Sequence, residues 1–290
     1  MAHLADAGDE VVESGTDIRD HGALTAEFEV ADADVVYHLA AQADVGGSWD
    51  SAVETLRVNV EGTLNVLAAA RRAGVGRVLV VTSADVYGVV RPDELPLDES
   101  TPFRPVSPYA ASKAAADLYA LQAWLGHHQD VVRARSFNHL GPGQSDRFVA
   151  SALASRVVAN ELGGGEVVRV GNLDARRDFT DVRDVVRAYR LLILHGSPGE
   201  AYNVCSGVDR PVREIAERLV ALARRPMRLE ADPALLRPVD LPVSRGDPAK
   251  LRAATGWRPE IDLDRTLADL LDDWRRRLAE AGPDQPLAHP

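Results

Sequence analysis

The sequence predicts an α/β fold in which helices cover both faces of a doubly wound parallel sheet. Over the first 136 residues, short apolar runs rich in β-branched residues alternate with longer runs rich in Ala and Leu. The apolar runs are continuous, which is typical of strands buried on both faces. The chain has 290 residues, a length that suits one large domain or two interlocked domains.

In the first half, strands are expected at 34–39, 77–82 and 131–134, and helices at 51–73 and 108–125. Pro108 would stand at the start of the second helix, where a missing N–H costs least. We predict that residues 1–136 form the first domain.

After residue 136 the predicted loops lengthen, with polar clusters at 137–144, 171–181 and 237–247. Helices are expected at 147–161, 181–194, 211–223, 247–254 and 263–279, and short strands near 167–170, 201–204 and 227–230. We therefore expect residues 137–280 to form a smaller α/β substrate lobe interlocked with the first domain. Residues 281–290 would be a frayed tail.

Composition excludes several classes of function. The chain has 33 Lys and Arg against 44 Asp and Glu, a formal charge of -11, which disfavours nucleic-acid binding. Its one cysteine, Cys205, excludes an intrachain disulfide and a multi-cysteine metal site, so we expect no metal and a cytoplasmic location. No stretch approaches the ~20 apolar residues of a membrane span, and the start lacks a signal-peptide core.

One pair of residues points to proton-transfer chemistry. Tyr109 and Lys113 are four positions apart, so they share a helix face, and an ammonium beside a phenol lowers the pKa of that phenol. Ser83 follows the strand at 77–82, at the sheet edge where ligands bind in open α/β folds. Taken singly, these residues could be a solvated helix face and a turn serine. Their order along the chain favours a catalytic interpretation.

With these motifs the sequence resembles the extended short-chain dehydrogenase/reductases that act on nucleotide sugars, the NAD-dependent epimerase/dehydratase family. The matching segments are 36–41, 59–67, 83–88 and 108–113. The resemblance implies a Rossmann-like fold, NADP or NAD as cofactor, and a catalytic set of Ser83, Tyr109 and Lys113 with Asp85 nearby. It also implies a cofactor site that includes Leu39, Ala40, Ala41 and Gln42, with Asp17 and Ile18 at the adenine. A surface turn remains the alternative for Asp17.

The second half resembles the GDP-sugar branch of that family at 137–144, 170–184, 202–207, 236–242 and 256–259. The resemblance implies that Asn138 contacts the substrate and His139 the cofactor, and that Asn172, Arg177 and Arg237 surround the GDP portion. Ser83 and Asp85 would also face the substrate. An arginine fork matches phosphate oxygens and stays charged, although a surface ion pair is the alternative for Arg177.

The sequence departs from the family pattern in two places. It lacks the strand and Gly-x-x-Gly-x-x-Gly turn that hold a pyrophosphate; residues 1–8 are typical of a helix end and 9–12 of the family's second strand. We expect either a start codon assigned too late or a native truncation. Ala84-Asp85 follows Ser83 where dehydratases carry a Glu two residues after the Ser or Thr. Residues 141–144 stand where GDP-mannose dehydratases carry two arginines.

These departures favour a reductase over a dehydratase. The resemblance implies NAD(P)H-dependent reduction of the C4 ketone of GDP-4-keto-6-deoxy-D-mannose. The alternatives are a GDP-mannose 4,6-dehydratase, a nucleotide-sugar 4-epimerase, and a truncated, non-catalytic homologue that binds nucleotide sugars. The C4 configuration of the product and the choice between NAD and NADP stay open. The resemblance also implies a homodimer through the helices at 51–73 and 108–125.

Overall fold

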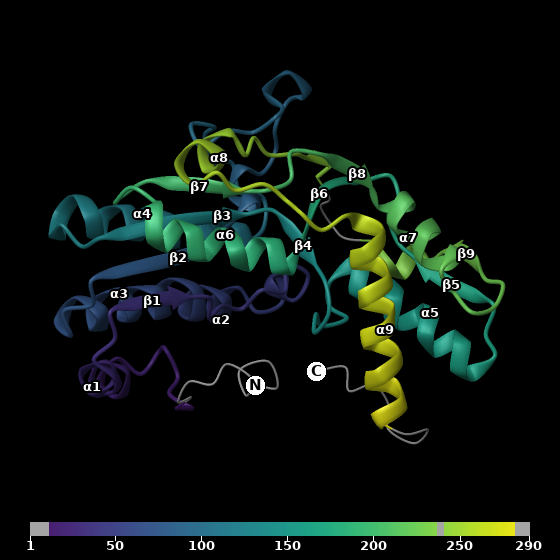
Figure 1. The fold of residues 1–290 in the computed structure, drawn as a ribbon, viewed down its shortest axis with the longest axis horizontal. Helices are drawn as coiled ribbons and strands as arrows, with labels where there is room; N and C mark the ends of the chain where they lie inside the picture. Colours follow the sequence, from purple (N-terminus) through teal and green to yellow (C-terminus); the bar gives the residue numbers. More distant parts are fainter. Residues whose placement is uncertain (1–11, 237–240, 282–290) are drawn as a thin grey trace.

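The computed structural model describes residues 12–236 and 241–281. Its main sheet consists of four parallel strands in the order β1 (Val35–His38), β2 (Arg77–Ser83), β3 (Val131–Ser136) and β7 (Ala201–Val204), as Figure 1 shows. The predicted Rossmann-like parallel sheet is confirmed. In the register, Ser83 at the end of β2 lies opposite Ser136 at the end of β3.

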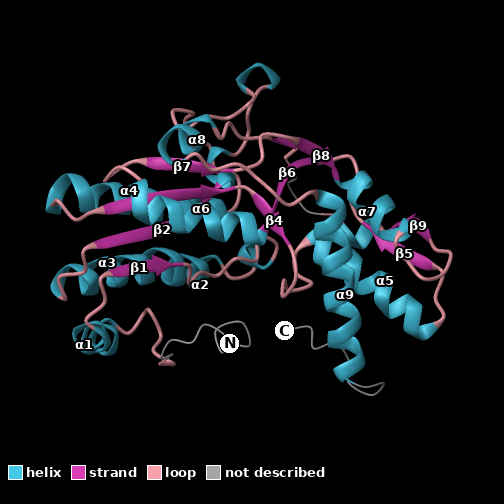
Figure 2. Ribbon diagram, viewed as in Figure 1, coloured by secondary structure: helices cyan, strands magenta, loops and turns pink. Residues whose placement is uncertain are grey.

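Helices cover both faces of this sheet (Figure 2). α3 (Gly62–Arg72) and α4 (Pro108–His127) pack on the face that carries Val78 and Val80. α6 (Val182–His195) and α8 (Ala249–Thr255) pack on the face that carries Leu79 and Val132. Because successive strand residues point to opposite faces, a continuous apolar run supplies both layers.

The long helix expected over 51–73 contains a π turn. α2 (Ala52–Leu56) runs into η2 (Arg57–Glu61), a five-residue π-helical segment, and then into α3. Asn59 in this turn is buried; its Nδ2 donates to Ser112 Oγ and to the Gln42 carbonyl, and its Oδ1 accepts from Gln42 N–H. The π turn therefore directs one amide into the joint between α4 and the loop after β1. α1 (His21–Ala31) packs against α3.

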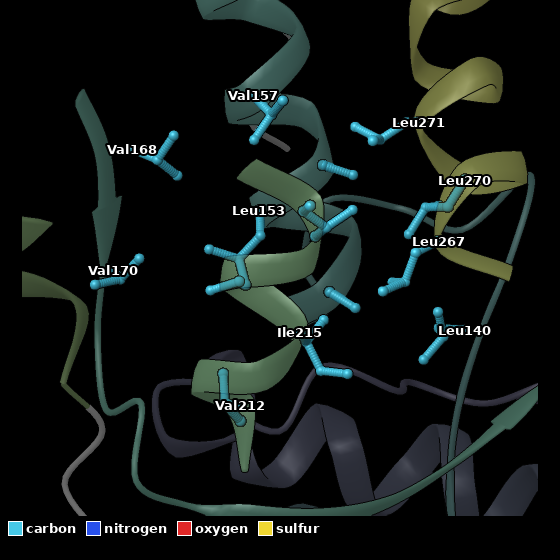
Figure 3. Close-up of a cluster of buried hydrophobic side chains, with 14 of the residues drawn as sticks. Leu140, Leu153, Val157, Val168, Val170, Val212, Ile215, Leu267, Leu270 and Leu271 are labelled. Carbon is cyan, nitrogen blue, oxygen red and sulfur yellow. The ribbon is translucent and has the colours of Figure 1, made fainter. Parts of the chain in front are cut away.

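A second lobe forms beyond the main sheet. α5 (Val149–Gly163), α7 (Val212–Ala221) and α9 (Leu263–Ala281) pack with the parallel pair β5 (Val167–Val170) and β9 (Arg228–Ala231). Figure 3 shows their shared core, where Leu153, Val168, Ile215 and Leu270 meet. The helices and strands expected in this half are confirmed to within two residues at most ends.

The polar segments predicted as loops contain strands, which corrects that prediction. β4 (Asn138–Leu140), β6 (Arg176–Asp181) and β10 (Val243–Ser244) form a second sheet in the order β10-β6-β4, and β8 (Asp209–Pro211) pairs antiparallel with β6. Each of these strands pairs with a segment distant in sequence, so local composition could not indicate it. The remaining short elements are the 3₁₀ turns η1 (Gly47–Trp49), η3 (Ala84–Tyr87), η4 (Pro92–Glu94) and η5 (Pro233–Leu235).

The division at residue 136 stays a prediction. α6, β7 and α8 lie after that boundary and complete the layers of the main sheet, as an interlocked arrangement requires. Most of the strand expected at 9–12 lies outside the described residues, and Val12 has no regular structure. Within the described ranges, none of the helices is long and apolar enough to cross a bilayer.

Candidate active site

A cavity of about 560 Å³ lies at the carboxyl ends of β2 and β3, where the second lobe meets the main sheet. It brings together most of the site residues predicted from the sequence. These are Leu39, Ala41, Ser83, Asp85, Tyr109, Lys113, Asn138, His139, Asn172 and Arg177. Ala40 and Gln42 are not among its lining residues, and Arg237 lies outside the described residues.

Ser83 and Tyr109 meet at one end of this cavity. Ser83 is the last residue of β2, and its Oγ accepts a hydrogen bond from Asp85 N–H at 3.1 Å. Tyr109 is the second residue of α4, whose N-cap Ser107 accepts from Ala110 N–H. Both side chains line the cavity, and the Ser83 hydroxyl is near enough to the Tyr109 phenol to lower the pKa of that phenol. The strand end and the helix start therefore converge on one point.

A glycine closes the loop that follows Ser83. Gly88 has φ +58°, and a β-carbon there would lie 1.6 Å from the Arg104 carbonyl oxygen. Arg104 N–H also donates to the Val86 carbonyl at 3.0 Å. This approach leaves no space for a side chain at Gly88 and fixes the turn that carries Asp85.

Tyr109 differs from the sequence prediction in its acidity. Burial raises the pKa of the phenol well above 10, the nearby Asp85 carboxylate raises it further, and the hydrogen bond with Ser83 opposes both. The sequence argument expected Lys113 to lower this pKa. The structure corrects it, because the desolvation of a buried phenolate dominates. A phenol that keeps its proton at neutral pH can act as an acid.

Lys113 lies one turn further along α4 and is buried. Its Nζ donates to the Val81 carbonyl at 3.0 Å, the one hydrogen bond that it makes with the described residues. An ammonium has three N–H donors. Two donors can therefore serve a ligand such as a ribose with vicinal hydroxyls. Burial lowers the pKa of this ammonium to about 8.

This buried ammonium predicts a pH-dependent stability. In the unfolded chain the Lys113 pKa is near 10.5, so between about pH 8 and 10.5 the unfolded state binds more protons and the folded state gains stability as pH rises. Lys113→Met lacks this gain. From about pH 7 to 10.5 we expect the unfolding free energy of the unsubstituted chain to rise by about 3 kcal/mol relative to the variant. Urea denaturation followed by circular dichroism measures it, and a difference that is constant with pH would contradict the assignment.

Behind the face of α4 that carries Tyr109 and Lys113 lies a buried ion cluster. Asp117, two turns after Tyr109, accepts from Arg133 Nη1 at 2.5 Å and from Arg135 Nε and Nη2 at 2.9 and 3.0 Å. Thr82 Oγ1, beside Ser83, donates to the same carboxylate at 3.1 Å. Burial raises the Asp117 pKa, but Arg135 and Arg133 together bring it below its ordinary value. The cluster joins α4 to β2 and β3 directly behind the Ser83–Tyr109 pair.

His139 lines the cavity from the start of the second lobe. Its Nδ1 lies 3.2 Å from the Phe137 carbonyl oxygen, which can only accept, so Nδ1 carries the proton. Burial lowers the His139 pKa, and the ring is neutral at pH 7. Nε2 is therefore an acceptor, suited to a ligand hydroxyl or amide.

Asp17 and Ile18, predicted to meet the adenine, do not line the cavity. The Asp17 carboxylate binds the Arg19 guanidinium, which lowers its pKa to about 2. The Ile18 side chain packs against α3, where a β-carbon on Gly62 would lie 2.4 Å from Ile18 Cδ1. Their assignment to the adenine stays a prediction.

The cavity also contains residues that the sequence analysis missed. Arg156 lines it from α5 and donates to the Arg169 carbonyl at 2.9 Å, and burial lowers its pKa. It follows Val149 and Leu153 on one helix face, so a lone arginine on an apolar stripe was the available signal. Ser136 and Tyr189 also line the cavity. Nothing local in the sequence brings these two together.

Comparison with known proteins agrees with this geometry. The family described as GDP-mannose 4,6 dehydratase matches residues 3–270. A GDP-6-deoxy-D-mannose reductase of Pseudomonas aeruginosa is 40% identical over 249 residues, which cover 85% of this chain and 82% of the relative. A UDP-glucose 4-epimerase of Mycolicibacterium smegmatis is 32% identical over 259 residues, covering 88% of this chain and 79% of the relative.

Solved structures show the same likeness. RMD from Pseudomonas aeruginosa complexed with NADPH superposes with a TM-score of 0.88 at 37% identity, over 96% of this chain and 94% of that chain. The NAD complex of the Thermus thermophilus UDP-glucose 4-epimerase gives 0.82 at 30% identity, over 92% of this chain and 87% of that chain. With the sheet, the Ser83–Tyr109 contact and the Lys113 position in place, the chain belongs to the GDP-mannose 4,6-dehydratase family of extended short-chain dehydrogenase/reductases.

Proposed function

We propose that this NAD(P)-dependent nucleotide-sugar oxidoreductase reduces the C4 ketone of GDP-4-keto-6-deoxy-D-mannose. The observation that carries the proposal is that Ser83, Tyr109 and Lys113 line one cavity at the carboxyl ends of the strands. The 40% identity with a GDP-6-deoxy-D-mannose reductase supports the choice of substrate. NADPH in one solved relative and NAD in another support a nicotinamide cofactor.

Each residue at this site would have its own role in the reduction. NAD(P)H supplies the hydride to C4 when bound. Ser83 donates a hydrogen bond to the carbonyl oxygen, and Tyr109 gives its proton to the oxygen as negative charge develops there. Lys113 would hold the ribose hydroxyls with the two donors that Val81 leaves. His139, as a neutral acceptor, fits the cofactor side of the cavity.

The residues beside Ser83 favour reduction over dehydration. Dehydratases of the resembled family carry a Glu two residues after the Ser or Thr, and this chain carries the shorter Asp85, which impairs a positioned proton transfer. The test is incubation of the 290-residue chain with NADPH or NADH and the 4-keto sugar, following cofactor oxidation and identifying the product. No cofactor oxidation with either nucleotide would refute the proposal.

A GDP-mannose 4,6-dehydratase is the second candidate, because Asp85 provides a carboxylate close enough to influence the Tyr109 phenol. Relatives with that activity include one from Sinorhizobium fredii, 30% identical over 250 residues that cover 79% of this chain and 70% of the relative. A dehydratase consumes GDP-mannose without added reductant. Appearance of the 4-keto product from GDP-mannose and catalytic NADP or NAD would favour it.

Arg177 is proposed to bind the diphosphate. It lies on β6 and lines the cavity. Its Nη1 donates to the Leu241 carbonyl at 2.7 Å, and this hydrogen bond orients the guanidinium group. Arg177→Ala should weaken GDP-sugar binding by about 1.5–3 kcal/mol and spare NADPH binding, because the residue belongs to the second lobe. Calorimetric titration with both ligands measures this.

Arg176 is the matched control for this prediction. It precedes Arg177 on the same strand, pairs with Asp209 and is absent from the cavity lining. Arg176→Ala should leave GDP-sugar binding within about twofold, because Arg176 does not line the cavity. Equal losses for the two variants would show that Arg177 acts only through the strand.

We also propose a homodimer built on α2 and α4, in a cytoplasmic protein whose lone Cys205 is a buried thiol. Val53 and Leu56 on α2 and Leu118 and Leu125 on α4 are each more than half exposed, and the two helices pack side by side. Such an apolar patch is typical of an interface. A second copy would cover it through the same helices.

Leu118→Glu should convert the dimer into a monomer of about 31.3 kDa, because it buries a carboxylate in the proposed interface. Light scattering after gel filtration measures the mass. Leu162→Glu, at a comparably exposed site on α5, should stay dimeric. A monomeric unsubstituted chain would refute the dimer.

A further inference from the structure

Two serine–tyrosine pairs lie at the ends of neighbouring strands, and the proposed mechanism uses only one of them. Ser83 at the end of β2 lies beside Tyr109 of α4 in the cavity. Ser136 at the end of β3 bonds Tyr189 of α6, with the two oxygens 2.6 Å apart. Ser83 and Ser136 are partners in the strand register. The cavity wall therefore presents two hydroxyl pairs, one strand apart.

The Ser136–Tyr189 pair lines the cavity and can form further hydrogen bonds. Ser136 and Tyr189 are both buried and both line the cavity. Two hydroxyls have two donors and four acceptor sites between them, and their mutual bond uses one of each. Among the described residues, no other hydrogen bond reaches either oxygen. Buried hydroxyls are normally satisfied, so this capacity suits a ligand.

The position of the pair indicates which part of a ligand it meets. If the carbonyl oxygen lies at Ser83 and Tyr109, the hydride donor must approach the carbonyl carbon to about 3–3.5 Å. The adjacent wall is the end of β3 and the start of β4, where His139 offers an acceptor. An ionised Tyr189 would raise the Tyr109 pKa, so the two phenols are within electrostatic reach.

We infer that Ser136 and Tyr189 bind the carboxamide of the nicotinamide and so orient the ring toward the substrate ketone. A carboxamide offers both N–H donors and a carbonyl acceptor, which matches a pair that can donate and accept. The inference rests on the proposed function, because it takes the carbonyl site at Ser83 and Tyr109 as given. Tyr189 and Ser136 are then positioning residues for the hydride donor.

The test compares two ligands in titrations carried to millimolar concentration. NADPH contains the nicotinamide, and 2′-phospho-ADP-ribose lacks it. Tyr189→Phe and Ser136→Ala should each raise the Kd for NADPH about three- to tenfold, the loss of one neutral hydrogen bond. Binding of 2′-phospho-ADP-ribose should stay within about twofold. The 3-acetylpyridine analogue of NADPH, which replaces the amide NH₂ by a methyl group, should show a smaller effect of Tyr189→Phe.

Tyr202→Phe is the matched control. Tyr202 is equally buried, its oxygen accepts from Ser197 N–H at 3.0 Å, and it lies outside the cavity lining. This variant should bind both ligands like the unsubstituted chain, and circular dichroism should show all variants folded.

The inference would be overturned if the unsubstituted chain did not bind NADPH. It would also be overturned if the Tyr189 and Ser136 variants lost affinity equally for both ligands, or for neither. A third contrary result would be a rise only in the KM for the keto sugar. The last would assign the pair to the hexose. If reduction of the keto sugar fails while the selective loss for NADPH persists, the proposed reaction is refuted and the nicotinamide contact stands.

Discussion

Tyr109→Phe should lower turnover of the 4-keto sugar by about 10²–10⁴-fold, the usual contribution of a positioned acid. The phenol oxygen is the only atom removed. It lies beside Ser83 in the cavity, and burial together with the nearby Asp85 carboxylate raises the pKa of the phenol. Steady-state kinetics with saturating NADPH measures the loss, and GDP-sugar binding by calorimetry should change little because the second lobe is untouched.

Tyr119→Phe is the control on the same helix. Tyr119 is 41% exposed and does not line the cavity, so its variant should retain full turnover. If Tyr109→Phe kept more than about a tenth of the original rate, another group would have to supply the proton.

Asp117→Asn should reduce the free energy of unfolding by about 3–5 kcal/mol, the cost of breaking a buried ion pair from one side. The carboxylate is fully buried and is the shared partner of Arg133 and Arg135, so neutralising it leaves two buried guanidinium groups without compensation. Its pKa lies below the ordinary value, so the ion pairs weaken only when acid protonates it. Urea denaturation at neutral pH measures the change.

Glu29→Gln makes the same carboxylate-to-amide change in an exposed pair with Arg72. It should alter the unfolding free energy by less than about 1 kcal/mol. An Asp117→Asn variant as stable as Glu29→Gln would mean that the cluster relaxes or admits water, and that it does not fix α4 against the strands.

The main sheet could be predicted because its information is local. The run at 77–82 has four consecutive apolar residues at 78–81 and the run at 131–134 is mostly apolar, which is typical of strands covered on both faces, and Pro108 marks a helix start. The grouping of Ser83, Tyr109 and Lys113 in one cavity could be predicted for a similar reason. Tyr109 and Lys113 are four residues apart on a helix and so share a face, and Ser83 ends a strand at the sheet edge where ligands bind.

The strands β4, β6 and β10 could not be predicted, because their sequences are polar and their partners are distant. Backbone hydrogen bonds to distant segments hold these strands in place, and no periodic pattern of hydrophobic residues in the sequence indicates such bonds. The π turn at Asn59 could not be predicted either, because Asn59 forms its side-chain hydrogen bonds with Ser112 and Gln42, which belong to other segments.

The sequence by itself determined the fold class and the family resemblance. It also placed Ser83 at a strand end and Tyr109 and Lys113 on one helix face, because strand and helix periodicities depend on residues that are close together in the sequence. Only the tertiary structure decided the acidity of Tyr109, which follows from how deeply the phenol is buried and how near Asp85 lies. It also decided that Ser136 meets Tyr189 across 53 positions. Desolvation and long-range contacts are properties of the folded, packed chain, and the spacing of residues along the sequence does not predict them.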